Sequence, residues 1–423
     1  MKRIFFLTFA TFLLASCSQD DPDKSFKRAT PISPNASMQE QIATQNEAAL
    51  KLFAEIYDNS PDAETSNVGF SPLSYYSCIG MVANGAEDET LKEMKQMLGY
   101  KEISLESINE NNRMILENFK ALDPKVTFNL TNSFWYHHEV DIYSSFKNTL
   151  TDFYKAKIEA CDFASPLTIP TINSWIEKET QGKIKDFLNK DEHPEAAIAI
   201  NALYFKAPWV RKFDKSKTFK SDFTRGDGMK EKVDMMSEGN GDYLYNYLDG
   251  IQTAILSLGS DLNSPAFSIA FFLPEEGMAM NDFLKKLNYE KMSSLIKGCV
   301  ESEATKGTMP ALFIPRFTCQ YETYFKDILR KKGITKPFDK DAAQFTALGN
   351  PGDDNFYLDE IKQKIFFSVD EDGAEGAAAT GTSVSGGIHP TMYLNRPFVY
   401  VVRENATGTI VFMGAISNPN KTN

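Results

Sequence analysis

A tract of small residues near the C-terminal end separates two segments of strand character. The tract, Gly373–Gly387, reads GAEGAAATGTSVSGG, and Glu375 and Val384 are its only large side chains. Such a composition cannot form a hydrophobic core. A segment of this length inside a compact domain is more often functional than idle, although a flexible linker is the alternative. The rest of the chain must therefore fold with a long loop of small side chains between two strands.

Apolar periodicity places helices in the first third of the chain and strands in the last third. The segment 39–59 has a helical apolar face, and Pro72 directly after Ser71 favours a second helix that runs to Gly85. A third helix is expected in 89–98, before Gly99. A fourth helix, in 171–188, is expected to break at Gly182 and to be followed by a short helix. Further strands are predicted at 125–136, 196–209, 267–273, 312–317 and 364–369, and two more on either side of a turn at Asn405–Gly408. This order predicts an α+β fold with mostly antiparallel sheets in one domain.

The N-terminus has the character of a targeting signal. Lys2 and Arg3 precede an apolar run that ends at Leu14, and Cys17 follows small residues, which predicts a lipoprotein signal peptide with a lipobox over residues 1–17. A plain secretory signal is the alternative. The apolar run is too short to span a bilayer. Residues 18–38 are polar and predict a flexible tether, so the folded domain is expected over residues 39–420.

Composition and missing motifs exclude several classes of function. The net charge of −12 argues against nucleic acid or a heparin-like polyanion as a partner. No GxSxG, phosphate loop or HExxH occurs, and adjacent His137 and His138 on a strand should point to opposite faces, so we expect neither enzyme nor metal nor cofactor. An exported hydrolase with a spatially assembled site remains an alternative. The spacing does not say whether cysteines pair; they are Cys78, Cys161, Cys299 and Cys319.

Six stretches in the right order resemble the serpin family. They are NVGFSPLSYYSCIGMVANGAEDETLKEMKQMLG, INSWIEKETQGKIKDFL, INALYFKAPW, IPRF with LRKKGITKPF, VDEDGAEGAAAT, and NRPFVYVVRENATGTIVFMGAISNP. The resemblance covers roughly residues 40 to 420. It implies the serpin fold, with three mostly antiparallel β-sheets, about eight or nine helices and an exposed reactive-centre loop at about 371–391.

The resemblance also implies a mechanism, suicide inhibition of a protease. The protease cleaves the loop, an acyl-enzyme ester forms, and the hinge of the loop inserts as a new strand into the central sheet. Small residues suit insertion, because alternate side chains must pass into the interior, and no proline lies between Val369 and His389. The tract spans roughly 46 Å when extended, at about 3.3 Å per residue. The implied hinge residues are Glu371, Gly373, Ala374, Glu375, Gly376, Ala377, Ala378, Ala379 and Thr380.

Two supporting clusters follow from the same resemblance. One, the shutter, places Ser71, Ser74 and Asn201 beside Gln363, which stands where the family has a histidine. A glutamine bonds in both directions but does not titrate near neutral pH. The other pairs Glu371 with Arg316 near Trp209 at the base of the hinge.

Counts along the loop place the reactive bond among small residues. Counting from Gly373 puts it after Gly387, and counting back from Pro397 puts it after Gly386. A glycine is a poor anchor for most pockets, so Val384 or Ser385 is an alternative; the candidates are Val384, Ser385, Gly386, Gly387 and Ile388. Small residues favour a serine endopeptidase of elastase-like or subtilisin-like specificity.

The sequence thus predicts a monomeric inhibitor that forms a covalent complex with its target protease. The lipid anchor at Cys17 would hold it at the outer membrane or cell surface of a Gram-negative cell, with the domain periplasmic or extracellular. A non-inhibitory serpin-fold binding protein that is cleaved as a plain substrate is the main alternative, and an inhibitor of cysteine proteases is a further one.

Overall fold

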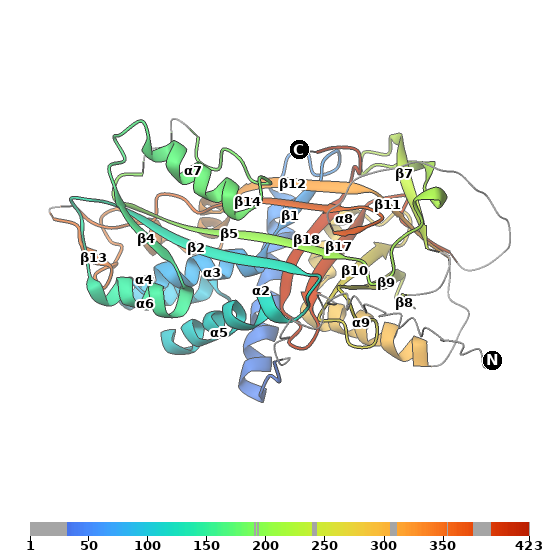
Figure 1. Cartoon of the computed structure of the whole chain (residues 1–423), viewed down its shortest axis with the longest axis horizontal. Helices are drawn as coiled ribbons and strands as arrows, with labels where there is room; N and C mark the ends of the chain where they lie inside the picture. The colour runs from blue at the N-terminus through green and yellow to red at the C-terminus, as the bar shows by residue number, and fades with distance from the viewer. Residues whose placement is uncertain are drawn as a thin grey trace, which may run out of the picture.

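A computed structural model describes residues 32–189, 192, 194–238, 243–304, 311–352, 354–374 and 391–422. This part of the chain holds nine α-helices: α2 (Ala36–Asp58), α3 (Pro72–Ala83), α4 (Asp88–Met97), α5 (Leu105–Asn118), α6 (Ser144–Tyr154), α7 (Thr168–Glu179), α8 (Met280–Lys286), α9 (Tyr289–Ala304) and α10 (Lys326–Lys331). Figure 1 shows them arranged around the sheets.

Three large sheets and one small one organise the strands. The central sheet has the order β12 (Phe317–Tyr324), β14 (Lys362–Val369), β15 (Gly373–Ala374), β5 (Ala197–Pro208), β2 (Thr127–His137) and β4 (Lys157–Cys161). The back sheet has the order β1 (Val68–Phe70), β18 (Ile410–Ile416), β17 (Phe398–Glu404), β10 (Phe267–Pro274), β9 (Ile251–Leu258) and β8 (Leu244–Leu248). The third has β16 (Thr391–Tyr393), β11 (Ala311–Pro315), β7 (Lys230–Glu238) and β6 (Phe219–Thr224), and β13 (Gly349–Asn350) pairs with β3 (Asp141–Ile142).

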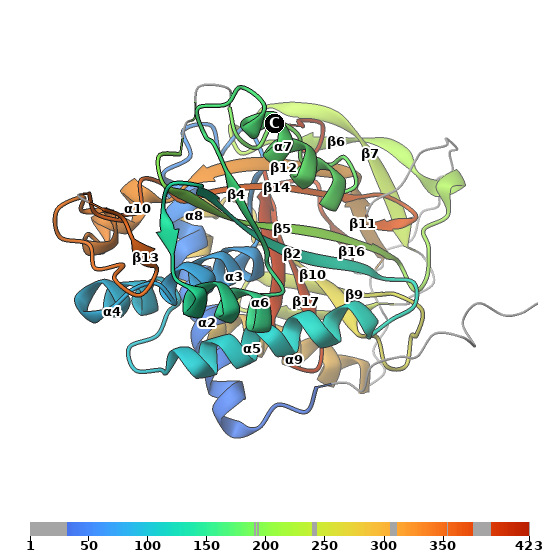
Figure 2. The ribbon, with the colours of Figure 1, turned by 60° about the vertical axis from the view of Figure 1, so that its left-hand side comes forward.

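Most strand pairs are antiparallel, as predicted. The parallel exceptions are β2 with β4 and β11 with β16. The back sheet crosses behind the central sheet, and α3 lies between the two (Figure 2). Helix α3 is buried on nearly every side, in keeping with its apolar sequence. Its start is fixed by Ser71, which accepts a hydrogen bond from the Ser74 backbone N–H, and by Pro72 in the first turn.

The first helix begins before the expected domain boundary. Asn35 caps α2 by accepting a hydrogen bond from the Met38 N–H, so the helix starts at Ala36, inside the segment 18–38 that was predicted as a tether. The other residues of that segment up to 31, and the signal peptide 1–17 with Cys17, lie outside the described residues.

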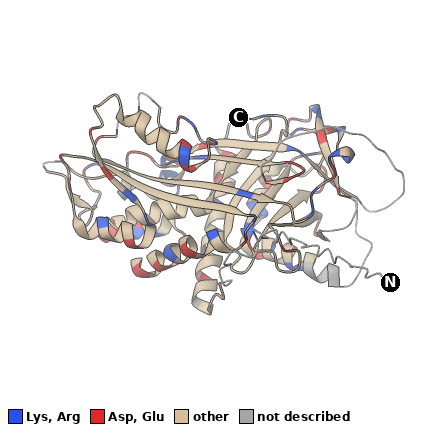
Figure 3. Ribbon diagram, in the orientation of Figure 1, with Lys and Arg blue, Asp and Glu red and all other residues tan. Residues whose placement is uncertain are grey.

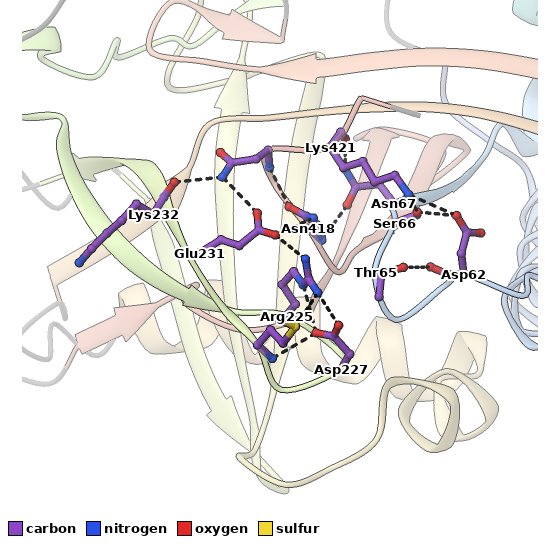
Figure 4. Close-up of polar contacts among 12 residues, drawn as sticks. Asp62, Thr65, Ser66, Asn67, Arg225, Asp227, Glu231, Lys232, Asn418 and Lys421 are labelled. Atoms are coloured by element: carbon purple, nitrogen blue, oxygen red, sulfur yellow. Dashed lines mark hydrogen bonds and ion pairs between the residues drawn. The ribbon is translucent and has the colours of Figure 1, made fainter.

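Polar side chains tie the last residues of the chain to two other loops (Figure 4). Asn67 donates to the backbone oxygens of Thr318 and Lys421, and it accepts from the Asn418 N–H. Across from them, Glu231 accepts from Asn418 and pairs with Arg225. These contacts join the end of the back sheet to β12 of the central sheet and to the β6–β7 hairpin.

Three local predictions were wrong in whole or in part. The short helix expected after Gly182 does not form, because Gln181, Gly182 and Asp186 adopt positive φ angles of 52°, 77° and 48° that a right-handed helix excludes. The strand predicted at 312–317 is confirmed over 312–315, within β11, but its end is wrong because Phe317 already begins β12. The rings of His137 and His138 stack at 4.6 Å, because β2 ends at His137 and the alternation of side chains ends with it.

Charged residues of both signs are distributed over the helices and loops (Figure 3). Among the described residues, no group of His, Cys, Asp and Glu has an arrangement that could hold a metal ion. No helix in the described ranges combines the length and the apolar character that a membrane span requires. Cys78, Cys161, Cys299 and Cys319 are free thiols.

Candidate functional site

A tight turn at Asp370–Gly373 connects β14 to β15 and begins the predicted hinge. Val369 pairs with Ala374 across the turn, and the Asp370 N–H donates to the Gly373 oxygen at 3.0 Å. The Asp370 carboxylate accepts from the N–H groups of Asp372 and Gly373. Burial raises the pKa of Asp370 despite these two hydrogen bonds.

Gly373 fits where no other residue would. Its φ angle is +150°, and a Cβ atom there would lie 2.3 Å from the Ala207 oxygen and 2.5 Å from the Pro208 Cα. Both neighbours are backbone atoms of β5 and cannot move aside. The turn therefore sits directly against the end of β5 because residue 373 lacks a side chain.

Arg316 and Glu371 form a bidentate ion pair at the base of the hinge. The Nε atom lies 2.8 Å from Oε2, and Nη2 lies 2.6 Å from Oε1. Glu371 is fully buried, and Thr218 also donates to it. A buried carboxylate needs this degree of pairing, because desolvation alone would strongly disfavour its charge.

Tryptophan and two lysines hold the rest of the turn. Trp209, which is 2 % exposed, donates its indole N–H to the Asp370 oxygen at 2.7 Å. Lys212 and Lys215 contact the two oxygens of Asp372 at 2.9 and 2.6 Å. Their hydrogen bonds hold the pKa of Asp372 below its ordinary value. The residues that follow β5 thus hold the turn through one hydrogen bond from Trp209 and two ion pairs from the lysines.

The expected shutter is present as two separate halves. On the β14 side, the Gln363 amide accepts from the Ser71 N–H and donates to the Ser71 oxygen, both at 2.9 Å. The Ser71 hydroxyl donates to the Val411 oxygen, and Ser74 contributes its backbone N–H to Ser71. The Gln363 side chain therefore hydrogen-bonds to both the backbone N–H and the backbone oxygen of Ser71, the N-cap residue of α3.

The β5 side of the shutter contains residues that sequence reasoning missed. Asn201 donates to Asn132 on β2 at 2.8 Å, and Ser77 on α3 donates to both Asn132 and Asn112. The Asn201 Oδ1 atom is buried and has no hydrogen-bond partner among the described residues. Asn201 therefore does not contact Ser71, Ser74 or Gln363 through any hydrogen bond described, and one of its acceptors is left open.

Between these halves, β5 and β14 are joined only through β15 in the described part of the chain. Gly373 and Ala374 pair with Pro208 and Ala207 of β5, and Ala374 pairs with Val369 of β14. Because β15 is antiparallel to both neighbours, β5 and β14 run parallel to each other. The central sheet thus already contains the first two residues of an additional strand.

The remaining predicted site residues lie outside the described residues. They are the later hinge positions Glu375, Gly376, Ala377, Ala378, Ala379 and Thr380, and the reactive-bond candidates Val384, Ser385, Gly386, Gly387 and Ile388. Lys212, Lys215, Thr218 and Asn132 were not identified in advance, and they carry no motif signal.

The chain matches known proteins over nearly its whole length. The family model described as Serpin (serine protease inhibitor) matches residues 43–419. Neuroserpin of Gallus gallus is 28% identical over 417 residues, which cover 95% of each chain, and Serpin I2 of Homo sapiens is 27% identical over 88% of this chain and 90% of its own.

Solved structures agree with this assignment. The thermophilic serpin tengpin in its native state superposes with a TM-score of 0.78 at 29% identity, over 94% of this chain and 98% of its own. Thyroxine-binding globulin in complex with thyroxine shares the fold, with a TM-score of 0.77 at 21% identity over 90% of this chain and all of its own. The structural matches confirm the predicted fold, and the match to the family model supports a protease-inhibitor type of function in general. The chain belongs to the serpin family.

Proposed function

We propose that this chain is a suicide inhibitor that traps a serine endopeptidase of elastase-like or subtilisin-like specificity. The observation that carries the proposal is the position of β15, which lies between two parallel strands and starts the segment that would insert. A strand that continues from Ala374 gains antiparallel partners on both sides.

The register of β15 supports the insertion path. If the hinge continued in this register, each residue after Ala374 would pair with a residue one position earlier on β5 and on β14. Six residues beyond Ala374, Thr380 would lie opposite both Asn201 and Gln363. A hydroxyl at that level could donate to the buried Asn201 Oδ1, the acceptor that has no described partner. Insertion would thus join the two halves of the shutter.

In the inserted strand, the small side chains would face the core and the charged one would face outward. Leu203 and Phe205 of β5, and Ile365 and Phe367 of β14, all belong to the buried core under the sheet. Residues directly opposite them share their face. The inward set would then be Gly376, Ala378 and Thr380, all small, whereas the one charged residue, Glu375, would face outward.

The proposed chemistry needs only groups of the protease and the loop. The protease serine forms an ester with the carbonyl carbon of the residue before the cut, the amide bond breaks, and the leaving nitrogen takes up the proton that the serine hydroxyl releases. This new amino group begins the C-terminal fragment, which would stay in the fold through β17 and β18 of the back sheet. Insertion then moves the ester-bound protease along the sheet before water can complete hydrolysis. The backbone pairs gained by about a dozen residues, each worth roughly 0.5–1.5 kcal/mol net, would drive this step.

The location and target complete the proposal. Lipidation at Cys17 would anchor the protein, as a monomer, at the outer membrane or cell surface of a Gram-negative cell. The small residues from Val384 to Gly387 would select proteases with small primary pockets, and the absence of Arg and Lys from this stretch disfavours trypsin-like enzymes.

The chain from Ser18 onward, which retains every described residue, provides the test. It is mixed in turn with pancreatic elastase, subtilisin, trypsin and papain, and the products are run on denaturing gels and mapped by mass spectrometry. A denaturation-resistant band near the summed masses with elastase or subtilisin, and cleavage within 383–388, are the expected results. Clean cleavage without that band would favour a non-inhibitory binding protein, and a band with papain alone would indicate a cysteine protease inhibitor.

A further inference from the structure

The segment after α7 lies over the outer face of the central sheet (Figure 1). We call residues 180–189 together with Glu192 the strap. The strap contacts strands on both sides of the seam between β5 and β14, the seam at whose end β15 begins.

The strap has a defined shape despite its lack of helix. The Ile184 N–H donates to Thr180 Oγ1 at 3.1 Å. The Asn173 side chain of α7 accepts from the Leu188 N–H and donates to the Leu188 oxygen, both at 2.8 Å. Positive φ angles at Gln181 and Gly182 turn the chain back from the helix end. The strap is therefore fixed to α7.

On the β5 side, the contact is apolar. Ile184, Phe187 and Leu188 of the strap are buried in one cluster with Ile172 and Ile176 of α7. Ile200 of β5 and Trp135 of β2 complete this cluster from the sheet. The helix and the strap thus pack as one unit against the β5 half of the sheet.

On the β14 side, the contact is made by cations. Lys364 of β14 donates to the Lys185 oxygen at 2.9 Å, and Lys183 of the strap lies 4.9 Å from the centre of the Phe366 ring. Lys362 lies 3.0 Å from Glu192 and 5.5 Å from the centre of the Phe187 ring. These contacts cross the seam.

Lys362 is more buried than Lys364, whose side chain is 15 % exposed. The Lys362 side chain is 8 % exposed, and it lies between Glu192 of the strap and Glu322 of β12, the latter at 3.2 Å. The two carboxylates are matched in exposure, at 33 % and 32 %. A half-buried pair of this kind is screened less by solvent than a surface pair.

We propose that the Lys362–Glu192 ion pair is a clasp that closes the strap across the seam and sets the barrier to entry of a strand. It is a positioning pair, since neither residue would touch the protease. The proposal rests on the proposed function only for the identity of the entering strand.

The two ion pairs of Lys362 should respond differently when a strand enters. β12 and β14 are paired along their full length, from Phe317 with Val369 to Tyr324 with Lys362. Lys362 and Glu322 therefore move together, and their contact survives the movement of β14. Glu192 is held to the strap by Asn189, whose oxygen accepts from the Glu192 N–H at 3.1 Å and whose side chain donates to Glu192 Oε1 at 2.8 Å. The neighbouring Leu188 is bonded to Asn173 of α7, so Glu192 belongs to the β5 side, and separation of β14 from β5 at this level would break the Lys362–Glu192 contact.

The experiment compares Glu192→Gln with Glu322→Gln, which remove one charge each from the same lysine. The chain from Ser18 is incubated with a synthetic peptide of residues 375–384, EGAAATGTSV, and uptake is followed by intact mass and by the rise in melting temperature. We expect uptake to be about tenfold faster in Glu192→Gln, a barrier change of about 1.4 kcal/mol, and within about twofold of the parent in Glu322→Gln. Lys362→Arg, which keeps the charge, is expected to match the parent.

A merely structural role would lower the melting temperature in both glutamine variants without separating their uptake rates. Equal acceleration in both, or no acceleration in Glu192→Gln, would overturn the clasp, and so would an absence of uptake in every variant. The peptide assay contains no protease. Selective acceleration in Glu192→Gln would therefore support the clasp even if the gel test showed no covalent complex and the proposed function failed.

Discussion

Gln363 on β14 hydrogen-bonds to both backbone groups of Ser71 at the start of α3, with both distances 2.9 Å. The pair joins the central sheet to the helix beneath it. Ser71 and Gln363 are both buried, at 0 % and 7 % exposure, so water does not compete for these groups.

Removal of this amide should therefore destabilise the intact protein. Gln363→Met keeps the length of the side chain but leaves the Ser71 N–H and oxygen without partners, at a cost of about 2 kcal/mol or more. The free energy of unfolding in urea is the measurement. Gln320→Met, at a half-buried position on β12, is the control and is expected to change it by less than about 0.5 kcal/mol. Equal effects would show that the Gln363 pairing contributes little.

The hinge turn should not tolerate a side chain at position 373. Gly373→Ala brings a Cβ atom against the backbone of Ala207 and Pro208, so β15 should detach or shift, and the melting temperature should fall by several degrees. Gly277→Ala is the matched control, because Gly277 also has a positive φ angle, of +87°, but has no atom within 4 Å. If Gly277→Ala costs as much as Gly373→Ala, backbone strain alone explains the loss and the close approach to β5 is unimportant.

The contact of Asp372 with Lys212 and Lys215 should weaken in acid. The folded pKa of Asp372 is lowered, so the contact stabilises the fold above the ordinary value of 3.8, and this contribution is lost as pH falls through the folded pKa. The melting temperatures of the parent and Asp372→Asn should differ by a constant amount between pH 6.5 and 4.5. The difference should narrow below about pH 3.8. A difference that already narrows between pH 6.5 and 5 would contradict this account.

The two faces of the proposed inserted strand give a further prediction. By the register of β15, residue 378 would face the core beside Leu203 and Ile365, and residue 377 would face outward. Ala378→Glu should convert the inhibitor into a substrate, because insertion would bury an unpaired carboxylate. Ala377→Glu, one residue away, should still form the covalent complex. The fraction of protease trapped, rather than released, is the quantity to compare, and equal fractions would refute the register.

Part of this architecture could be predicted from the sequence. The α+β class, the capped start of α3 at Ser71 and the pair of Arg316 with Glu371 follow from local signals or from motifs shared with the family. The strap could not be predicted, because its Gly182 and Asp186 adopt positive φ angles in a segment whose composition favours helix. The partner of Asn201 was also missed: Asn132 sits opposite it on β2, and only the strand register brings the two amides together.

The central claim is that the hinge becomes a strand of the central sheet. The most direct test is to cleave the loop with a protease that cuts within 383–388, and to compare the melting temperatures of the intact and cleaved proteins. Insertion adds about a dozen backbone hydrogen bonds, so the cleaved protein should melt roughly 10 °C higher or more. A cleaved protein that melts at or below the temperature of the intact one would contradict the account.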